Sequence, residues 1–436
     1  MNVDLAMPIG ARATRARAWL GRRWPTVLLG LVLASFATGP QWLLAGQLPY
    51  RLLVFAIPAQ QLLLVAALAA NAVRHGFRSG IVSWPLLAVL LLLVESGLVA
   101  DLDPRLSVTR MAIAALGLAL PWGLPAVAVE PGTRTRYALL LALLPSLCAA
   151  LGMALQAANL HGALTGSATR VLRLHGASNA GWLACLAFAG FAIALHEAIR
   201  GRRPDFAALA AVNVAVAVLT GGRMGIGAGI VFAVAYCLLD DRIRTGAARL
   251  PRGLVGLGLL AAAVLFGWLV VETFHEPADM LDPSGRNTLW AGYLEQFRQS
   301  PTFGHGVGAT TLVSSYFNLP HNVYLRLLVE GGLVGFLLYG AAILLWGRRL
   351  LARIDPAERA FAQAMLLGLA VYALTDNLLT MPPTLIAFVY LGLMLGEPYR
   401  RSLAGGAFEP VKGAAAASDR RGSRPPRSAP GSSSGR

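Results

Sequence analysis

Long blocks of apolar residues alternate with short polar segments along most of the chain. Each block is close to the roughly 20 residues that a helix needs to cross about 30 Å of hydrocarbon. Because a helix satisfies its own backbone hydrogen bonds, this pattern predicts an all-α integral membrane protein with about 12 transmembrane helices. The predicted spans are about 26–46, 52–73, 80–99, 111–129, 137–157, 179–198, 206–219, 224–239, 253–271, 322–346, 360–379 and 383–397.

The connections between the blocks divide the chain. Residues 1–271 are predicted to form transmembrane helices 1–9 with short loops, apart from a longer external segment at about 158–178. Residues 272–321 are long enough to form an external loop domain. Residues 322–402 would hold transmembrane helices 10–12. Residues 403–436 turn to Gly, Ala, Ser, Pro and Arg, which predicts a disordered cytoplasmic tail.

Composition supports this interpretation. The chain is 56% hydrophobic and only 13% charged, with a mean hydropathy of +0.61, which excludes a soluble protein of this length. A net charge of +16 is compatible with nucleic-acid binding, but the arginines lie in short loops and in the tail rather than on one basic face. We therefore expect no nucleic-acid partner. With the N-terminus inside, roughly three quarters of the Lys and Arg residues face the cytoplasm, as the positive-inside rule requires.

A histidine stands at the external start of the tenth span, in the stretch LPHNVYLRLLVEGG. A helix N-terminus favours anions and disfavours a charged imidazolium, so His321 is expected to be neutral near pH 7. A neutral imidazole can take a proton from a hydroxyl group, as a general base does. The alternative is a histidine that caps the helix and bonds to loop carbonyls. Asn322, Arg326 and Glu330 follow on one stripe, where Arg326 can pair with Glu330.

Arginines are predicted at other external helix starts. Arg223, in LTGGRMGIGAG, begins the eighth span, and Arg170 and Arg173 precede HGASNAGW, where His175 and Asn179 stand at the start of the sixth. Arginine suits phosphate because its planar fork donates two parallel hydrogen bonds. A single interfacial arginine is more often an anchor that reaches for the membrane surface. Several on one face favour binding of a polyanionic headgroup such as a diphosphate.

The external loop contains a predicted helix after SGRN. Arg286 precedes it, and Trp290, Tyr293, Leu294 and Phe297 form an apolar stripe at helical spacing. This helix either lies in the membrane interface or packs on the bundle.

The turn PTFGHGVG follows this helix. It has three glycines for tight turns but no preceding strand, so it is not a dinucleotide fingerprint. The acidic segment ETFHEPADMLDP matches no metal motif, so no metal site is predicted. Glu95 and Asp376 lie in or near apolar spans, where a carboxylate is a functional candidate.

Four of these stretches together resemble the O-antigen ligase family of bacterial membrane glycosyltransferases, which also includes O-antigen polymerases and protein O-oligosaccharyltransferases. They are TGGR around Arg223, SGRNTLW around Arg286, PTFGHGVG, and HNVYLRLLVEGGLVG after His321. The resemblance covers about 220–340 closely and HGASNAGW more loosely. It implies a multi-pass inner-membrane protein with a long periplasmic loop domain over a lipid-accessible cavity.

The resemblance also implies a reaction. A glycan would pass from undecaprenyl diphosphate to a sugar hydroxyl of the lipid A core on the periplasmic face, with inversion and without a metal or other cofactor. Arg223 and Arg286 would bind the diphosphate and His321 would be the base. The residues expected to bind substrate around them are Arg170, Arg173, His175, Asn179, Trp290, Asn322 and Arg326.

Two alternatives stay open. A polymerase or a protein O-oligosaccharyltransferase of the same family would use another acceptor, and no residue in the chain identifies the acceptor. A transporter or flippase of the lipid-linked glycan would instead depend on ionisable groups at the bilayer midplane, such as Glu95, and on the glycine-rich start of the eighth span. The polar groups gather at the external helix ends, which favours the enzyme.

Overall fold

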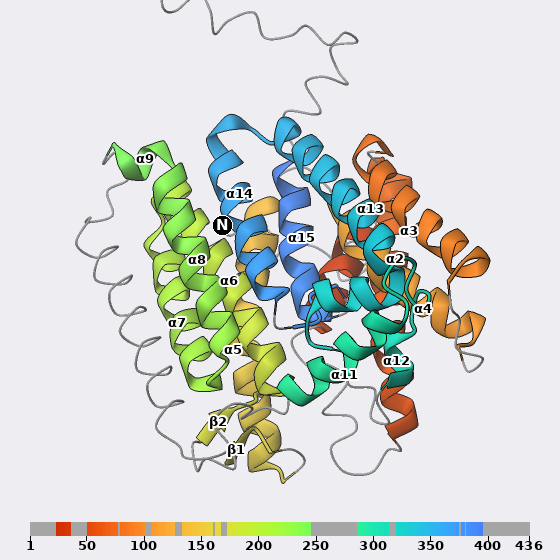
Figure 1. Cartoon of the computed structure of the whole chain (residues 1–436). Coiled ribbons are helices and arrows are strands. Elements are labelled where there is room, and N and C mark those ends of the chain that lie inside the picture. The colour runs from red at the N-terminus through yellow and green to blue at the C-terminus, as the bar shows by residue number, and fades with distance from the viewer. Residues whose placement is uncertain are drawn as a thin grey trace, which may run out of the picture. The chain divides into compact units, whose positions relative to one another are not determined.

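The computed structural model describes most of the chain as helices (Figure 1). The described residues are 23–35, 50–76, 79–100, 106–126, 133–159, 162–166, 172–245, 286–313, 320–374, 376–379 and 381–395. The first helix is Arg23–Ser35. It is followed by α2 (Tyr50–His75), α3 (Ser79–Leu98), α4 (Val108–Gly123) with the 3-10 turn η3 (Leu124–Ala126), α5 (Arg134–Ala157), α6 (Ala180–Gly201), α7 (Pro204–Thr220), α8 (Arg223–Leu239), α9 (Asp241–Arg244), α11 (Arg286–Gln299), α12 (Thr310–Val313), α13 (Val323–Arg353), α14 (Pro356–Tyr372) and α15 (Pro382–Met394).

Every predicted span except 253–271 contains a described helix, and that ninth span lies outside the described residues. Four of these helices are long and apolar enough to cross a membrane: Val108–Ala126, Arg134–Ala157, Ala180–Gly201 and Val323–Arg353. The protein is therefore mostly helical and multi-pass by length and composition. The count of twelve, the four-part division of the chain and the orientation of the loops stay predictions.

Local side chains begin several helices where the sequence places them. The amide oxygen of Asn179 accepts from the backbone N–H of Trp182 at 2.8 Å and caps α6. Asn322 caps α13 in the same way, with Leu325 as the donor at 3.0 Å. Such caps satisfy amides that the helix itself cannot bond. They fix the two helix starts on which the candidate site is built.

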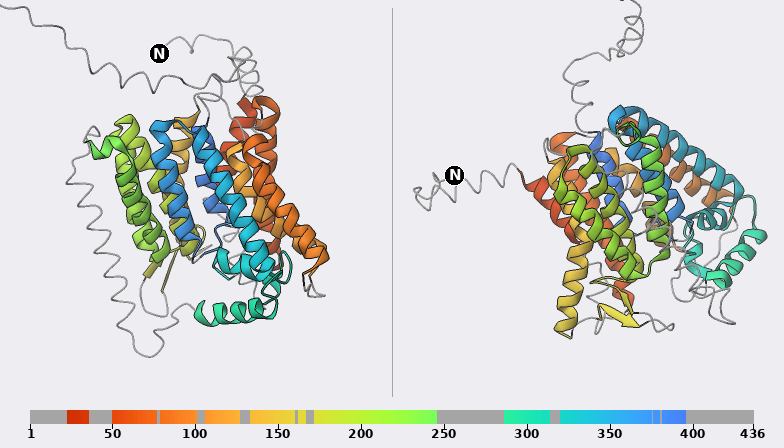
Figure 2. Two further views of the ribbon diagram at one scale, coloured as in Figure 1. Left: turned by 45° about the horizontal axis from the view of Figure 1, so that its top comes forward. Right: turned by 90° about the vertical axis from the view of Figure 1, so that its left-hand side faces the viewer.

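α6 is the central helix of the bundle and is buried along most of its length. It contacts α5, α7, α8 and α15, while α14 packs on α8 and α13 packs on α3. α14 and α15 thus lie between the α5–α8 group and the α3–α13 pair (Figures 1 and 2). The close approach of α8 to α6 depends on Gly225, because a Cβ there would lie 2.8 Å from the carbonyl oxygen of Ala184.

Two short strands depart from the all-α prediction. β1 (Leu164–Gly166) and β2 (Leu172–Leu174) pair antiparallel inside the predicted external segment 158–178, with Thr165 opposite Arg173. Strands of three residues contain too little alternation to be recognised from the sequence. Their effect is to hold Arg173 on a defined edge close to the start of α6.

α13 is interrupted at Gly332, which has φ 57° and ψ −161°. The turn PTFGHGVG fills this break: the amides of His305 and Gly306 donate to the carbonyls of Val329 and Glu330, both at 2.9 Å. In return, the amides of Leu333 and Val334 donate to the carbonyls of Pro301 and Thr302 at 2.8 and 3.1 Å. The backbone groups released by the break are thereby satisfied within the protein.

The glycines make this contact possible. A Cβ at Gly304 would lie 2.5 Å from the backbone nitrogen of Gly332, and Gly304 itself has φ 67°. The prediction of a structural turn is therefore confirmed. The turn also fixes the end of α11 against α13.

Candidate active site

His321 directly precedes the first turn of α13 and has a left-handed backbone with φ 47°. Such a conformation costs a non-glycine residue about 1–2 kcal/mol and is found mainly where the surrounding structure requires it. The capping role falls to Asn322, so the alternative of a capping histidine is wrong. The His321 side chain instead bonds to a carboxylate: its Nδ1 lies 3.1 Å from Oδ1 of Asp376.

Asp376 is held on several sides. Tyr372, one turn earlier, donates its hydroxyl to Oδ2 at 3.2 Å, and the amide of Asn377 donates to Oδ1 at 2.8 Å. The Asp376 side chain is 10% exposed and that of His321 is 37% exposed. Because an ionised carboxylate only accepts, Nδ1 of a neutral His321 carries the proton and Nε2 is left as the acceptor. This arrangement suits a general base whose imidazolium form the aspartate stabilises.

The start of α6 lies beside this pair. A Cβ built on Gly181 would lie 3.4 Å from Oδ1 of Asn179 and 3.9 Å from Oδ2 of Asp376. The hydroxyl of Tyr372 is also 3.3 Å from the carbonyl oxygen of Gly181. The HGASNAGW segment, with His175 and Asn179, therefore ends next to the His321–Asp376 pair. The amide oxygen of Asn179 is committed to its cap, so this residue acts by holding the helix start.

The start of α8 joins the same end of α6. Gly222 packs on Ala184, and Arg223, which is half-buried, begins α8 directly after it. Gly221 lies against Arg173, whose Nε would be 3.3 Å from a Cβ at that position. The structure thus brings Arg173 and the Arg223 helix start to the end of the bundle that holds His321. Arg170 lies outside the described residues.

Trp290 connects α11 to the end of the bundle that holds His321. Nε1 of Trp290 donates to the carbonyl oxygen of Pro320 at 2.6 Å, directly before His321. Arg286 is the first residue of α11, one helical turn before Trp290, and its side chain lies outside the described part of the structure. The backbone of Arg286 is therefore held close to the histidine segment.

The apolar face of α11 packs on α13. Tyr293 is fully buried with Leu325 and Val329, and Leu289, Trp290 and Phe297 pack around them. Leu294 is 43% exposed at the edge of the predicted stripe, and the buried face extends instead toward Leu289. Burial, and then the Glu330 carboxylate, raise the pKa of Tyr293. Its hydroxyl therefore stays protonated and donates to the carbonyl oxygen of Thr310 at 3.0 Å.

The predicted pair of Arg326 and Glu330 is confirmed. Nε of Arg326 donates to Oε1 of Glu330 at 3.0 Å, and both residues are 2% exposed. The Thr310 hydroxyl donates to the same carboxylate oxygen. This buried pair lies directly before the break in α13 and connects the helix to α12. It places Arg326 in the interior.

Sequence reasoning missed Asp376 as the partner of His321 and Tyr372 as a hydrogen-bond donor to that aspartate. Asp376 stands out as a carboxylate near an apolar span, and Tyr372 is four residues before it, which is a usable signal for a helix face. Their pairing with a histidine 55 residues away has no local signal.

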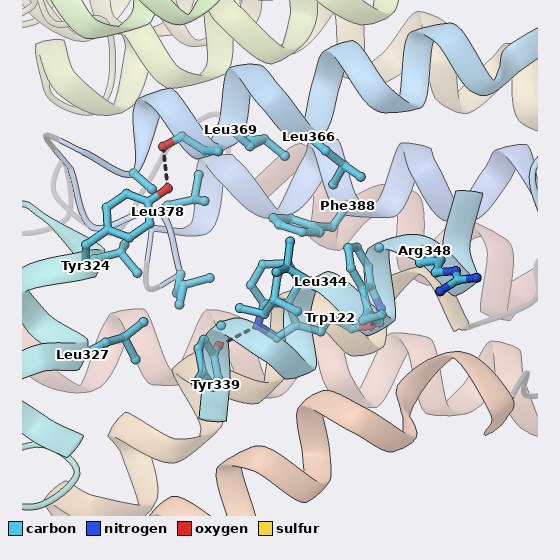
Figure 3. A pocket seen from close by; sticks show the side chains of 18 of the residues that line it. Trp122, Tyr324, Leu327, Tyr339, Leu344, Arg348, Leu366, Leu369, Leu378 and Phe388 are labelled. Carbon is cyan, nitrogen blue, oxygen red and sulfur yellow. Dashed lines mark hydrogen bonds between the residues drawn. The ribbon is translucent and has the colours of Figure 1, made fainter. Parts of the chain in front are cut away.

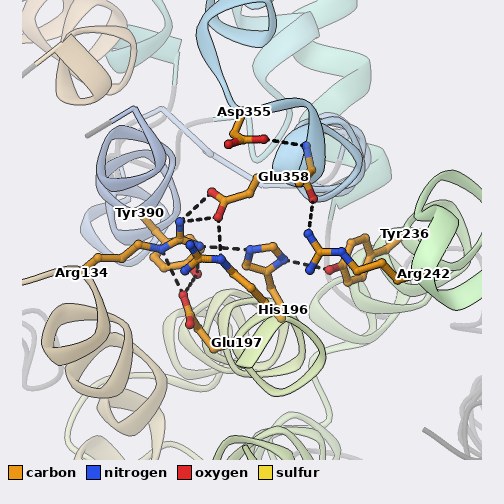
Figure 4. A network of polar contacts seen from close by, with 10 residues as sticks. Arg134, His196, Glu197, Tyr236, Arg242, Asp355, Glu358 and Tyr390 are labelled. Atoms are coloured by element: carbon orange, nitrogen blue, oxygen red, sulfur yellow. Dashed lines mark hydrogen bonds and ion pairs between the residues drawn. The ribbon is translucent and has the colours of Figure 1, made fainter. Parts of the chain in front are cut away.

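A second polar cluster, also missed, lies at the other end of α6 (Figure 4). Arg134 bonds to Glu358 at 2.6 Å and to Glu197 at 3.1 Å, and His196 lies 2.8 Å from the Tyr236 hydroxyl. His196 is sixteen residues after the first residue of α6, which corresponds to about 24 Å along the axis. The cluster is thus far from His321, and it joins α5, α6, α8 and α14 to one another.

Comparison with known proteins supports the resemblance. Residues 174–340 match a protein-family model described as O-antigen ligase. A protein named O-antigen ligase from Pseudomonas aeruginosa is 29% identical over 180 residues, which cover 38% of this chain and 41% of that relative. The match thus spans about two fifths of the relative's length. The matched region 174–340 contains α6–α8, α11 and the first half of α13, and with them the candidate base, whereas Asp376 lies beyond it.

Proposed function

Taking residues 174–340 as an O-antigen ligase region, we propose that this protein is a glycosyltransferase of the bacterial inner membrane. It transfers an O-antigen glycan from undecaprenyl diphosphate to a sugar hydroxyl of the lipid A core on the periplasmic face. The observation that carries the proposal is the His321–Asp376 hydrogen bond at the bundle end where Arg173 and the start of α8 meet.

The reaction follows from this geometry. Nε2 of His321 takes the proton of the acceptor hydroxyl while Asp376 stabilises the imidazolium that forms. The acceptor oxygen forms a bond to the anomeric carbon, and the bond between that carbon and the diphosphate oxygen breaks, which inverts the configuration. The diphosphate leaves with the electron pair, and the proton taken up by His321 is later lost to solvent.

The arginines supply the charge that this leaving group needs. Arg223 and Arg286 bind the diphosphate, assisted by Arg173 and by Arg170, because guanidinium groups neutralise phosphate without changing their own protonation. This lets the reaction proceed without a metal ion or another cofactor. Asn179, Asn322 and Trp290 act by positioning the helix starts and the segment before His321, and His175 borders the same segment.

The experiment is glycan transfer by the purified full-length protein in proteoliposomes. A polyprenyl-diphosphate glycan is offered together with core lipid, a second carrier-linked glycan and a peptide. We expect glycosylated core lipid, with the product lost in His321→Ala and kept in the control His75→Ala, which alters the end of α2. Product on the second glycan or on the peptide identifies the alternative polymerase or protein O-oligosaccharyltransferase. Absence of transfer to any acceptor by a folded protein refutes the enzyme and favours the transporter.

A further inference from the structure

An apolar groove of about 800 Å³ runs between α13 and α14, with α15 and Trp122 as its floor (Figure 3). This volume is within the range of ligand sites, about 300–1,000 Å³. Leucine, isoleucine and aromatic side chains form most of its wall. The groove is separate from the residues to which the reaction has been assigned.

The polar atoms of the floor are satisfied inside the protein. Nε1 of Trp122 donates to the Tyr339 hydroxyl at 2.6 Å, which in turn donates to the carbonyl oxygen of Leu118 at 2.7 Å. Nε1 of Trp346 donates to the carbonyl oxygen of Trp122 at 3.0 Å. The floor therefore presents aromatic carbon to an occupant, which suits a hydrocarbon chain and not a polar ligand.

The two ends of the groove differ. At the end near His321, α13 and α14 are joined by two hydrogen bonds: the amide of Val323 donates to the carbonyl of Ala373 at 2.9 Å, and the Tyr324 hydroxyl donates to that of Ala370 at 3.0 Å. These bonds separate the groove from the candidate active site. A lipid tail that entered from the active site would have to cross them.

The opposite end carries two cations, Arg348 and Arg359. Nε of Arg359 donates to the carbonyl of Leu351 at 3.1 Å, which leaves its two terminal NH₂ groups to donate elsewhere. Arg348 is exposed and makes no hydrogen bond or ion pair with another described residue. The neighbouring Arg349, in contrast, bonds to Ser83 and lies over the Trp84 ring.

We propose that this groove binds one anionic phospholipid. Its phosphate lies between Arg348 and Arg359, and one acyl chain lies along α13 over the aromatic floor. Basic groups at the ends of grooves between transmembrane helices are complementary to anionic headgroups, and the predicted topology places this end in the cytoplasmic leaflet. The proposal is independent of the glycosyl transfer, since it concerns neither His321 nor the diphosphate arginines.

Two glycines of the wall allow the groove to be blocked without strain. Gly340 and Gly347 line it seven residues apart on α13, and no atom lies within 4 Å of a Cβ built on either one. A large side chain at these positions would extend into the space that the acyl chain is proposed to occupy. Replacing glycine within a helix also favours the helical conformation, so these variants are expected to fold.

The test measures binding of spin-labelled phosphatidylglycerol and phosphatidylcholine to the full-length protein in nanodiscs. We expect wild type to prefer phosphatidylglycerol. The double variant Arg348→Gln, Arg359→Gln should lose about fivefold in this preference per arginine, or about thirtyfold in total. The control Arg353→Gln replaces an exposed arginine in the last turn of α13, outside the groove, and should keep the wild-type preference for phosphatidylglycerol. Gly347→Phe should reduce binding of both lipids at this site.

Three results would overturn the proposal. They are equal phosphatidylglycerol binding in wild type and the double arginine variant, an equal loss in Arg353→Gln, and unchanged binding in Gly347→Phe. Displacement of phosphatidylglycerol by an equal concentration of a polyprenyl phosphate would assign the groove to the isoprenoid chain instead. Each result is read from lipid binding alone, so a failure of the proposed glycosyl transfer leaves this test unchanged.

Discussion

The charge of Asp376 is the feature on which the proposed base depends most directly. Asp376→Asn keeps the size of the side chain and an oxygen that can accept from Nδ1 of His321, so it removes the charge and preserves the geometry. Two unit charges about 4 Å apart attract by about 4 kcal/mol at an effective dielectric constant of 20. The atoms here are 3.1 Å apart, but the His321 side chain is 37% exposed and solvent weakens the attraction.

We therefore expect roughly 3 kcal/mol less stabilisation of the imidazolium, which corresponds to a fall in kcat of about 10²-fold. Tyr372→Phe removes one hydrogen bond to the Asp376 carboxylate, at 3.2 Å, and should reduce kcat by about tenfold. The order of the two effects is itself predicted, because the tyrosine acts on His321 only through the aspartate. KM for the donor should change little in either variant.

The assay is steady-state transfer in proteoliposomes with donor concentration varied, and circular dichroism of each variant verifies its fold. A wild-type kcat in Asp376→Asn would refute the assignment of His321 as a base assisted by this carboxylate. A fall in KM for the donor without a loss of kcat would also refute it. That result would mean that Asp376 only repels the diphosphate.

Three further predictions concern binding and stability. Arg223→Gln should raise KM for the polyprenyl-diphosphate donor at least tenfold, because a charged hydrogen bond to phosphate contributes about 1.5–3 kcal/mol. Initial-rate kinetics measure this, and an unchanged KM contradicts it. Gly304→Ala should destabilise the protein by at least about 2 kcal/mol, because Gly304 has φ 67° and the added Cβ would meet the backbone of Gly332. A thermal unfolding midpoint equal to wild type would contradict the close contact between the PTFGHGVG turn and the break in α13. Arg134→Met should cost about 3 kcal/mol, because it leaves the buried Glu197 without a charged partner while Glu358 keeps its ion pair with Arg200 at 2.7 Å. Denaturant unfolding in detergent measures this, and a neutral result would mean that the cluster does not hold the helices together.

Several features of the fold and the candidate site followed from the sequence because they depend on residues within one or two helical turns. The apolar blocks predicted the locations of the helices, and the positions of Asn179 and Asn322 marked the starts of α6 and α13. The spacing of Arg326 and Glu330 predicted their pair. The glycines of PTFGHGVG predicted a tight turn. Each of these is a local rule of backbone geometry that no distant contact has to complete.

Only the tertiary structure decided which distant residues meet. In a membrane bundle the lipid-facing and inward-facing sides of a helix are both apolar, so the sequence pattern does not reveal which face is buried. It therefore could not indicate that Asp376 bonds His321 or that Arg134 bonds Glu197 on α6 and Glu358 on α14. On α11, the contact with α13 decides the buried face, so Leu294, apolar and correctly spaced, is exposed while Leu289 packs on α13. Local sequence determined where each helix begins and ends. The candidate site forms where the starts of α6, α8 and α13 converge, and only the packing of the helices sets the distances between those starts.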